Sequence, residues 1–102
     1  MISIIIINYN VTKYLKKCLK SLDTYKPTIP YEIIIIDNSV NLNKISLTEI
    51  KGVNIRLYNF NSNLGFSKAV NIGIQKSKGD YILLMNPDSF LFDNSIDRMI
   101  KY

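Results

Sequence analysis

Two short apolar runs are the most prominent pattern in the chain. Residues 4–7 and residues 33–36 are all isoleucine, and polar residues stand on both sides of each run. Runs of this length are too short for a helix, and an unbroken apolar run is typical of a parallel strand that is covered on both faces. The pattern therefore predicts buried strands over residues 2–8 and 32–37.

A helical period follows the first of these strands. Apolar side chains recur at the i, i+3, i+4, i+7 spacing of an amphipathic helix, with lysines on the opposite side. We expect this helix to begin near Lys13, after a cap at Asn10 or Thr12, and to end before Pro27 and Pro30. The apolar positions are Leu15, Cys18, Leu19 and Leu22.

The alternation continues after the second strand. A capping-box sequence at residues 46–49 predicts one short helix. The apolar residues at positions 53, 55 and 57 alternate with polar ones and predict a third, half-exposed strand. A second amphipathic helix is expected from Phe66, with Gly79 in its C′ position.

Residues 81–85 predict a fourth strand, and Asp93 is expected to cap a last helix. Because strands and helices alternate, the sequence favours an α/β fold with three layers (α/β/α) and a mostly parallel sheet. Ligands of such sheets bind beyond the carboxyl ends of the strands. Polar segments follow three of the predicted strands, at residues 8–10, 37–39 and 86–88, so we expect the functional site there.

Composition excludes several kinds of catalytic site. The 102 residues contain no histidine, which removes Ser-His-Asp and Cys-His mechanisms and histidine-ligated zinc. Cys18 is the only cysteine, so the chain can form no internal disulfide, and its place on the apolar side of the helix predicts a core residue. A site must therefore be built from carboxylates, amides, hydroxyls, lysine and backbone, with an oxygen-ligated metal as an option.

The common phosphate-binding motifs are also missing. No G-x-G-x-x-G follows the first strand and no G-x-x-x-x-G-K-[ST] is present, since the basic loop at residues 65–68 does not match. A nucleotide would have to be held by an aromatic face, a carboxylate and a metal. Tyr9, Asp37 and Asp88 offer these groups at the predicted strand ends, although each also has an ordinary interpretation as a packed tyrosine or a turn aspartate.

The net charge of +5 raises the question of a polyanionic partner. Nucleic acid, a membrane surface and a phosphorylated ligand would each suit a basic protein. The lysines are scattered, with local density only between residues 13 and 20, and arginine, the usual reader of bases and phosphates, occurs only twice. We therefore expect no nucleic-acid partner, and a basic nucleic-acid-binding α/β domain is kept as an alternative.

The chain lacks the sequence features of membrane insertion and export. Its apolar runs are far shorter than the roughly 20 residues of a membrane span. Its N-terminus has neither the basic region nor the small-residue cleavage site of a signal peptide. We expect a cytoplasmic location, with the inner face of the membrane as a further option.

Four blocks of the sequence resemble, in order and in spacing, those of family 2 glycosyltransferases. They are residues 4–10, 32–39, 63–73 and 79–88. The variants Asp37-Asn38 and Asn86-Pro87-Asp88 are most similar to the rhamnosyltransferase-like branch. The resemblance covers essentially the whole chain and implies the N-terminal half of a GT-A fold, with residues 1–102 as the nucleotide-sugar-binding portion of a longer transferase domain.

The same resemblance implies a donor, a metal and a set of site residues. The donor is a nucleoside-diphosphate sugar, and the metal is Mg²⁺ or Mn²⁺. Tyr9 matches the position that lines the nucleobase pocket, Asp37 the carboxylate that binds the base, and Asp88 the metal ligand. Asn86 stands where many relatives carry the first Asp of the D-x-D motif, which removes one negative charge. The other expected nucleotide-sugar-binding residues are Asn10, Asn38, Gly65 and Lys68.

The resemblance further implies inverting transfer to a cell-surface glycan or a lipid-linked acceptor, with an Asp or Glu base in an acceptor-binding half. The chain ends about 14 residues after Asp88, and neither Asp93 nor Asp97 matches that base. We expect the base beyond Tyr102 and no turnover by the isolated chain. A catalytically incomplete binding module and a nucleotidyltransferase-like domain are the alternatives. The fourth strand, residues 81–85, is expected at an open apolar edge that pairs with a second copy.

Overall fold

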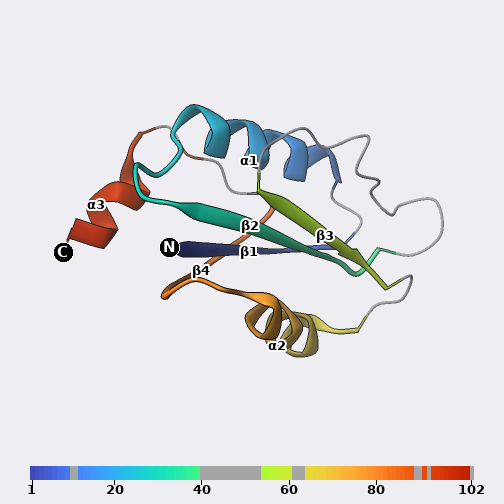
Figure 1. Ribbon diagram of the computed structural model, residues 1–102. Helices are drawn as coiled ribbons and strands as arrows, with labels where there is room; N and C mark the ends of the chain where they lie inside the picture. Colours follow the sequence, from blue (N-terminus) through green and yellow to red (C-terminus); the bar gives the residue numbers. More distant parts are fainter. Residues whose placement is uncertain (10–11, 40–53, 61–63, 89–90, 92, 102) are drawn as a thin grey trace.

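The protein forms a parallel sheet with helices on both faces, as the computed structural model shows for residues 1–9, 12–39, 54–60, 64–88, 91 and 93–101 (Figure 1). The four strands are ordered β3-β2-β1-β4, and all neighbouring pairs are parallel. The predicted α/β class and the parallel sheet are therefore confirmed. The elements are β1 (Ile2–Asn8), α1 (Thr12–Thr24), β2 (Tyr31–Asp37), β3 (Ile55–Asn59), α2 (Phe66–Lys76), β4 (Tyr81–Met85) and α3 (Ser95–Lys101).

The register of the sheet brings three strand ends together. Asn8 at the end of β1 lies opposite Asp37 at the end of β2, and Asp37 in turn lies opposite Asn59 at the end of β3. On the other side of β1, β4 pairs only as far as Met85, which lies opposite Ile6. The carboxyl ends of β1, β2 and β3 thus form one polar edge of the sheet.

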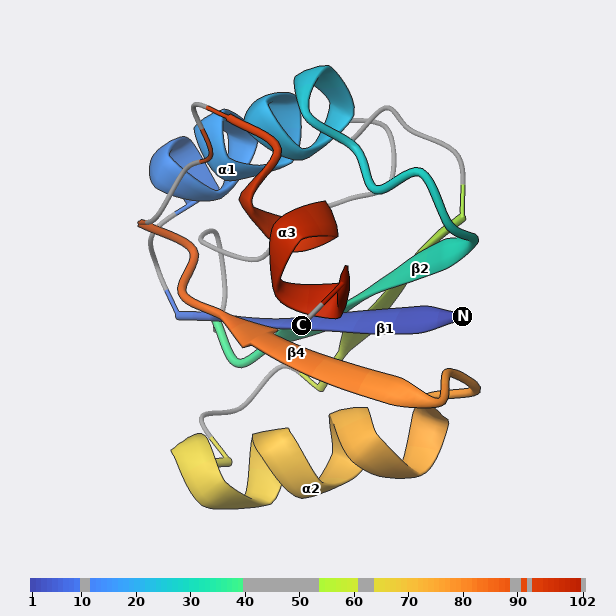
Figure 2. The ribbon, with the colours of Figure 1, turned by 90° about the vertical axis from the view of Figure 1, so that its left-hand side faces the viewer.

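The isoleucines of β1 divide between two cores. Ile4 and Ile6 face α1 and α3, whereas Ile5 and Ile7 face α2, so both faces of this central strand are buried (Figure 2). A buried isoleucine contributes about 2 kcal/mol, and this explains why an unbroken apolar run specifies a strand here. On the second face, α2 approaches so closely that a Cβ on Gly73 would lie 2.7 Å from Cγ2 of Ile5.

Several predicted element ends differ from the observed ones. The first helix begins at Thr12, so Thr12 is not its cap, and Asn10 lies outside the described residues, as do residues 46–53. The last helix begins at Ser95, and the carbonyl of Asn94 accepts its first hydrogen bond from the Arg98 N–H at 3.2 Å. The cap position is therefore occupied by Asn94, and Asp93 lies one residue before it. The carboxylate of Asp93 binds the hydroxyl of Ser95 and the guanidinium of Arg98.

Gly79 does not occupy the C′ position of α2, because the helix ends at Lys76 and the extended Ser77 is its C-cap. The structure gives Gly79 another role. A Cβ at this position would lie 2.6 Å from Oγ of Ser3 and 2.7 Å from the carbonyl oxygen of Met1. The glycine is therefore needed because the turn before β4 lies directly against the beginning of β1.

β4 lies at one edge of the sheet, as predicted, and among the described strands it pairs only with β1. Leu83 and Met85 pack on the core below α1, where Ile96 of α3 is also buried. The alternate side chains Ile82 and Leu84 are 46% and 43% exposed. None of the described helices is both long enough and apolar enough to cross a membrane.

Candidate functional site

Four buried polar residues gather at the carboxyl ends of β1 and β2. Asn8 and Asp37 end the two strands, and Asn38 and Ser39 follow directly. All four are buried, with at most 2% of the residue exposed. We refer to these four residues as the carboxyl-end cluster. Sequence analysis predicted Asp37 and Asn38 as binding residues. It placed Asn8 and Ser39 in the polar segments of the expected site but gave them no role.

Asn8 and Ser39 hold the carboxylate of Asp37. Nδ2 of Asn8 donates to Oδ1 of Asp37 at 3.1 Å and to Oγ of Ser39 at 3.2 Å. The backbone N–H of Ser39 donates to the same Oδ1 at 3.1 Å, which makes Asp37 the first residue of an Asx-turn. Asp37 therefore is the turn aspartate that the sequence analysis gave as its ordinary interpretation. The hydrogen bonds of the turn also fix the position of its carboxylate.

Two oxygens of the cluster lack the partners that burial demands. Within the described part of the chain, Oδ1 of Asn8 and Oδ1 of Asn38 accept no hydrogen bond. Their orientation is fixed, because Nδ2 of Asn8 is used as described and Nδ2 of Asn38 donates to the carbonyl of Gly65 at 3.4 Å. A buried polar atom without a partner costs about 1–3 kcal/mol, so such atoms usually bind water or a ligand. The cluster offers acceptors to a molecule that supplies N–H or O–H donors.

Gly65 connects the cluster to the beginning of α2. It is the N-cap residue of that helix and adopts φ +83°, a conformation that favours glycine. Gly65 itself has no side chain that could cap the helix, and the first turn of α2 contains no acidic residue. The exposed Lys68 lies in this first turn. The helix dipole and the lysine make this end of α2 favourable for a negatively charged group.

The remaining predicted residues lie around the same end of the sheet or outside the described residues. Tyr9 follows β1 and is 47% exposed. Asn86 and Asp88 follow β4 and are exposed, whereas Asn10 lies outside the described residues. Among the residues that the structure describes, no three Cys, Asp or Glu side chains gather in a way that could hold a metal.

Cys18 lies below the segment that carries Asn86 and Asp88. Its Sγ is 3.9 Å from the carbonyl oxygen of Asn86, and the residue is completely buried. Burial and, to a smaller extent, the negative charge of Asp88 raise the pKa of the Cys18 thiol to about 11. The thiol is therefore protonated and unreactive at neutral pH, which confirms the prediction of a core residue.

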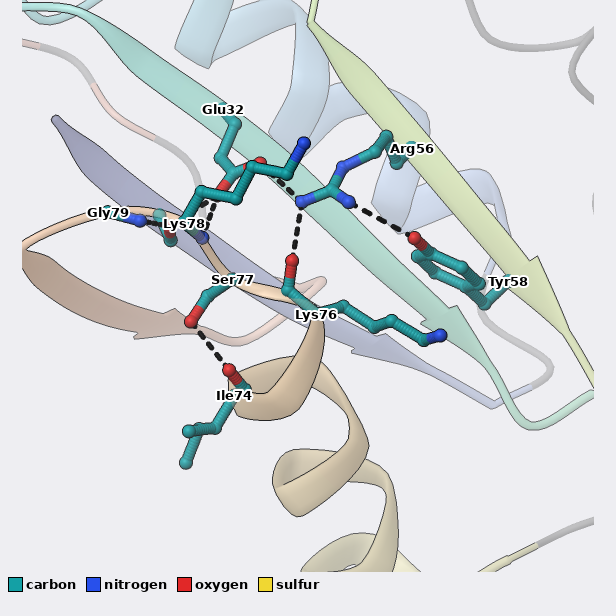
Figure 3. Close-up of polar contacts among 9 residues, drawn as sticks. Glu32, Arg56, Tyr58, Ile74, Lys76, Ser77, Lys78 and Gly79 are labelled. Carbon is teal, nitrogen blue, oxygen red and sulfur yellow. Dashed lines mark hydrogen bonds and ion pairs between the residues drawn. The ribbon is translucent and has the colours of Figure 1, made fainter.

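A second polar cluster, which sequence analysis missed, lies at the amino ends of the strands (Figure 3). Its members are Ser3, Glu32 and Arg56, and we refer to them as the amino-end cluster. Glu32 accepts hydrogen bonds from the hydroxyl of Ser3 at 2.6 Å and from the backbone N–H of Lys78 at 2.7 Å, and it forms an ion pair with Arg56. Burial alone would raise the pKa of Glu32, but these hydrogen bonds and the guanidinium hold it below its usual value.

Arg56 extends this cluster to α2. Its Nη2 donates to the carbonyl of Lys76 in the last turn of the helix at 2.6 Å, and its Nη1 donates to the hydroxyl of Tyr58 at 3.2 Å (Figure 3). The ammonium of Lys76 lies 5.3 Å from the centre of the Tyr58 ring, within reach of a cation–π interaction. These contacts fasten the end of α2 and the following turn to the sheet.

Known proteins match this chain over nearly all of its length. The sequence fits the model of the family described as Glycosyl transferase family 2 over residues 3–102. It is 32% identical to the uncharacterized glycosyltransferase YwdF of Bacillus subtilis and 31% identical to the glycosyltransferase GlyA of Streptococcus pneumoniae. Both alignments cover 98% of this chain, but only 37% of YwdF and 14% of GlyA. The chain thus spans about a third or less of these two relatives.

Solved structures show the same fold. Residues 1–349 of S. aureus TarS in complex with UDP match the protein with a TM-score of 0.78 at 21% identity, over 98% of this chain and 31% of that one. The structure of the same TarS fragment in complex with UDP-GlcNAc gives a TM-score of 0.77. The sheet and its helices are therefore those of a GT-A glycosyltransferase fold.

Proposed function

The chain belongs to glycosyl transferase family 2, and from this premise we propose that residues 1–102 bind the nucleotide-sugar donor of an inverting glycosyltransferase. The acceptor in this proposal is a cell-surface glycan or a lipid-linked precursor of one. The observation that carries the proposal is the buried carboxylate of Asp37 at the carboxyl end of the sheet. Asn8 holds this carboxylate, and two amide oxygens beside it accept no hydrogen bond from any described residue. A binding site at this end is what a parallel α/β sheet favours.

The chemistry of the carboxyl-end cluster suits a pyrimidine nucleoside. A uracil or thymine ring presents an N–H donor between two carbonyls, and the ribose adds hydroxyl donors. Asp37 is proposed to accept from the base, with the exposed ring of Tyr9 against its face and Asn10 and Asn38 beside it. The UDP and UDP-GlcNAc complexes of TarS, a protein of the same fold, support this choice of donor.

The diphosphate is proposed to lie between the carboxyl end of β4 and the beginning of α2. Asp88 and the amide oxygen of Asn86 are hard oxygen ligands of the kind that Mg²⁺ and Mn²⁺ prefer, and the diphosphate would supply further oxygens. When bound, the cation would neutralise charge on the departing diphosphate. Gly65 and Lys68 would contribute the positive end of α2. The variants Asp37-Asn38 and Asn86-Pro87-Asp88 are the basis for the rhamnosyltransferase-like branch, which stays a prediction.

Calorimetry with UDP in the presence and absence of Mn²⁺ tests this assignment. Asp37→Ala is expected to weaken binding at least tenfold with or without Mn²⁺, because a charge-assisted hydrogen bond to the base is lost. Asp88→Ala should leave metal-free binding unchanged and abolish the gain that Mn²⁺ provides. Asp80→Ala is the matched control, since Asp80 is an exposed carboxylate at the other end of the sheet. If both site variants bind UDP as tightly as the parent does, the site assignment is wrong.

We assign the catalytic base to a segment outside residues 1–102, because neither Asp93 nor Asp97 is available for that role. Asp93 binds Ser95 and Arg98 at the beginning of α3, and Asp97 accepts hydrogen bonds from Thr28. The isolated chain is therefore expected to bind the donor without transferring the sugar. Release of nucleoside diphosphate, measured with and without acceptor, tests this expectation, and robust turnover by the purified chain would contradict it.

We further propose that two copies of the chain pair through β4. This strand lies at the sheet edge with Ile82 and Leu84 partly exposed, and antiparallel pairing of two copies would give a two-fold symmetric contact. Light scattering should show a dimer that Leu84→Lys converts to a monomer. The control Phe60→Lys alters a side chain of similar exposure that follows β3, at the opposite edge, and should leave the dimer intact. A parent chain that stays monomeric as concentration rises would contradict the proposal.

The proposed location of this reaction is the cytoplasm, at the inner face of the membrane. A lipid-linked acceptor would hold the reaction at that surface, while the nucleotide-sugar donor would arrive from solution. Fractionation of cells that express the protein tests the location, and recovery outside the cytoplasm and the membrane would contradict it.

A further inference from the structure

The outward side of α1 carries a row of lysines. Lys13, Lys16, Lys17 and Lys20 follow the i, i+3, i+4, i+7 spacing, and all four are exposed. The buried residues of the same helix follow the same spacing two positions later, so the lysines lie on the side that points away from the sheet. We refer to these four residues as the lysine face.

The described residues of the protein do not neutralise the lysine face. In the part of the chain that the structure describes, none of the four ammonium groups forms a hydrogen bond or an ion pair, whereas Arg56, Arg98 and the N-terminus each pair with a carboxylate. Asp23 is the only acidic residue of α1. The helix therefore presents four positive charges within about two turns, a density that attracts polyanions.

A hollow lies beside the second half of the lysine face. It has a volume of about 360 Å³ and lies between α1 and the segment that precedes α3. Oγ of Ser21 accepts a hydrogen bond from the N–H of Leu91 at 2.8 Å, so the two walls are tied together. The lining residues are Lys17, Lys20, Ser21, Thr24, Tyr25 and Leu91. Two ammonium groups beside an apolar wall suit a phosphate group that is attached to a hydrocarbon.

We propose that the lysine face binds the surface of a membrane that contains anionic phospholipids, with a phosphate headgroup in the hollow beside Lys17 and Lys20. Lysine serves as a point charge and suits a fluid anionic surface, whereas arginine is the residue that reads nucleic-acid phosphates and bases in fixed geometry. No arginine lies on α1. Tyr14, which is 51% exposed, adds an aromatic ring of the kind enriched at membrane interfaces.

This mode of binding places the membrane parallel to the sheet, because α1 lies along one face of the sheet and its lysine face points outward (Figure 1). The carboxyl ends of the strands then point along the membrane surface. If the proposed function holds, a lipid-linked acceptor reaches the donor site from the membrane while the nucleotide sugar enters from solution. The binding itself does not depend on the proposed function.

Sedimentation with vesicles tests the lysine face directly. The protein is mixed with vesicles of pure phosphatidylcholine or with vesicles that also contain about 30 mol% phosphatidylserine. The phosphatidylserine supplies the negative surface charge on which such binding depends. The triple variant Lys13→Gln, Lys16→Gln, Lys20→Gln should lose affinity for the anionic vesicles by roughly 100-fold, since each lysine near the surface contributes about fivefold. The matched control is Lys26→Gln, Lys68→Gln, Lys78→Gln, which removes the same charge from exposed positions outside α1 and should lose less than tenfold.

Three results would overturn the proposal. Equal losses in the two triple variants would show that net charge alone drives binding. Equal binding of the parent to both kinds of vesicle would exclude an anionic surface as the partner. Tighter binding to a random-sequence DNA duplex than to anionic vesicles at the same salt concentration would assign the lysine face to nucleic acid. An unchanged melting temperature controls for folding, and unchanged UDP affinity of the α1 variant separates this surface from the donor site.

Discussion

One strand, β2, carries a buried carboxylate at each of its ends, and the two are treated very differently. Glu32, at the amino end, binds a hydroxyl, a backbone N–H and the guanidinium of Arg56. The same guanidinium also donates a hydrogen bond to the last turn of α2. Asp37, at the carboxyl end, is held by an amide and a backbone N–H, and two neighbouring amide oxygens accept no hydrogen bond among the described residues. Burial alone therefore does not distinguish a structural carboxylate from a functional one.

The difference lies in how completely the surroundings are satisfied. A complete hydrogen-bond network at the amino end contributes to the stability of the fold and offers little to a ligand. Acceptors without partners at the carboxyl end lower stability until a donor arrives, which is the usual condition of a binding site before its ligand is bound. Substitutions at the amino end should therefore change the free energy of unfolding, and those at the carboxyl end should change affinity.

The largest expected effect is that of Glu32→Ala on stability. The substitution removes the carboxylate that the guanidinium of Arg56 and the hydroxyl of Ser3 bind. We therefore expect a loss of about 3 kcal/mol in the free energy of unfolding. Urea denaturation measures this loss. Asp80→Ala, which breaks an exposed ion pair with the N-terminus, should cost less than about 1 kcal/mol. Similar losses in the two variants would show that the amino-end cluster has no special role.

The second prediction compares two glycines, one at each end of the sheet. Gly79→Ala should destabilise the protein by about 2 kcal/mol, because the new Cβ would collide with the backbone of Met1 and Ser3. A Cβ on Gly65 meets no atom of the described residues within 4 Å. The substitution Gly65→Ala is opposed by the φ of +83°, so a loss of about 1 kcal/mol is expected. Thermal unfolding of both variants measures the difference, and the reverse order would contradict the packing described for the turn before β4.

The third prediction separates affinity from stability. Asn8→Ala removes the donor that holds Asp37, and UDP affinity should fall about tenfold while unfolding loses only about 1 kcal/mol. Ser3→Ala is the matched control, since it removes a donor from Glu32 at the other end. It should cost similar stability and leave UDP affinity unchanged. A loss of affinity in both variants would mean that the two clusters are not functionally distinct.

The smallest expected effect is a dependence on acid pH. The pKa of Glu32 is lowered in the folded state, so its contribution to stability is complete above the ordinary glutamate pKa and is lost as pH falls through the folded-state value. The free energy of unfolding should therefore decline below about pH 4.5. Glu32→Gln should flatten this decline, and an identical slope in the parent and the variant would exclude Glu32 as its source.

The isoleucine runs and the helical spacing were sufficient to predict the order of the elements in the described regions. They could not predict which polar residues meet. Asn8 contacts Asp37, and Ser3 contacts Glu32, only because β1 and β2 pair in one particular register. The signal for the second pair was present, since Ser3 and Glu32 are polar residues that directly precede the two isoleucine runs. Their cationic partner Arg56 could not be identified without the register between β2 and β3.

Element ends were less predictable, and Gly79 shows why. A glycine shortly after an amphipathic pattern is typical of a helix C-terminus, but here the helix has already ended. A glycine is needed at this position because a larger side chain would collide with Ser3, which is distant in the sequence. Asp93 is similarly of a residue type that often caps helices, but it lies one residue before the actual cap position, Asn94. Local sequence rules do not include contacts from residues more than 70 positions away, and at the amino end such contacts determine the structure.

The central position of β1 also has a consequence for how the chain is made. Ile2 pairs with Tyr81 of β4, 79 positions later, so β1 leaves the ribosome long before the second of its two neighbours. At a synthesis rate of roughly 5–20 residues per second, the isoleucine edge of β1 waits several seconds for β4. Pairing over such a distance is slow, and an apolar strand edge that is open during this interval is a site for aggregation. Synthesis of this protein should therefore be sensitive to chaperones that cover nascent apolar segments.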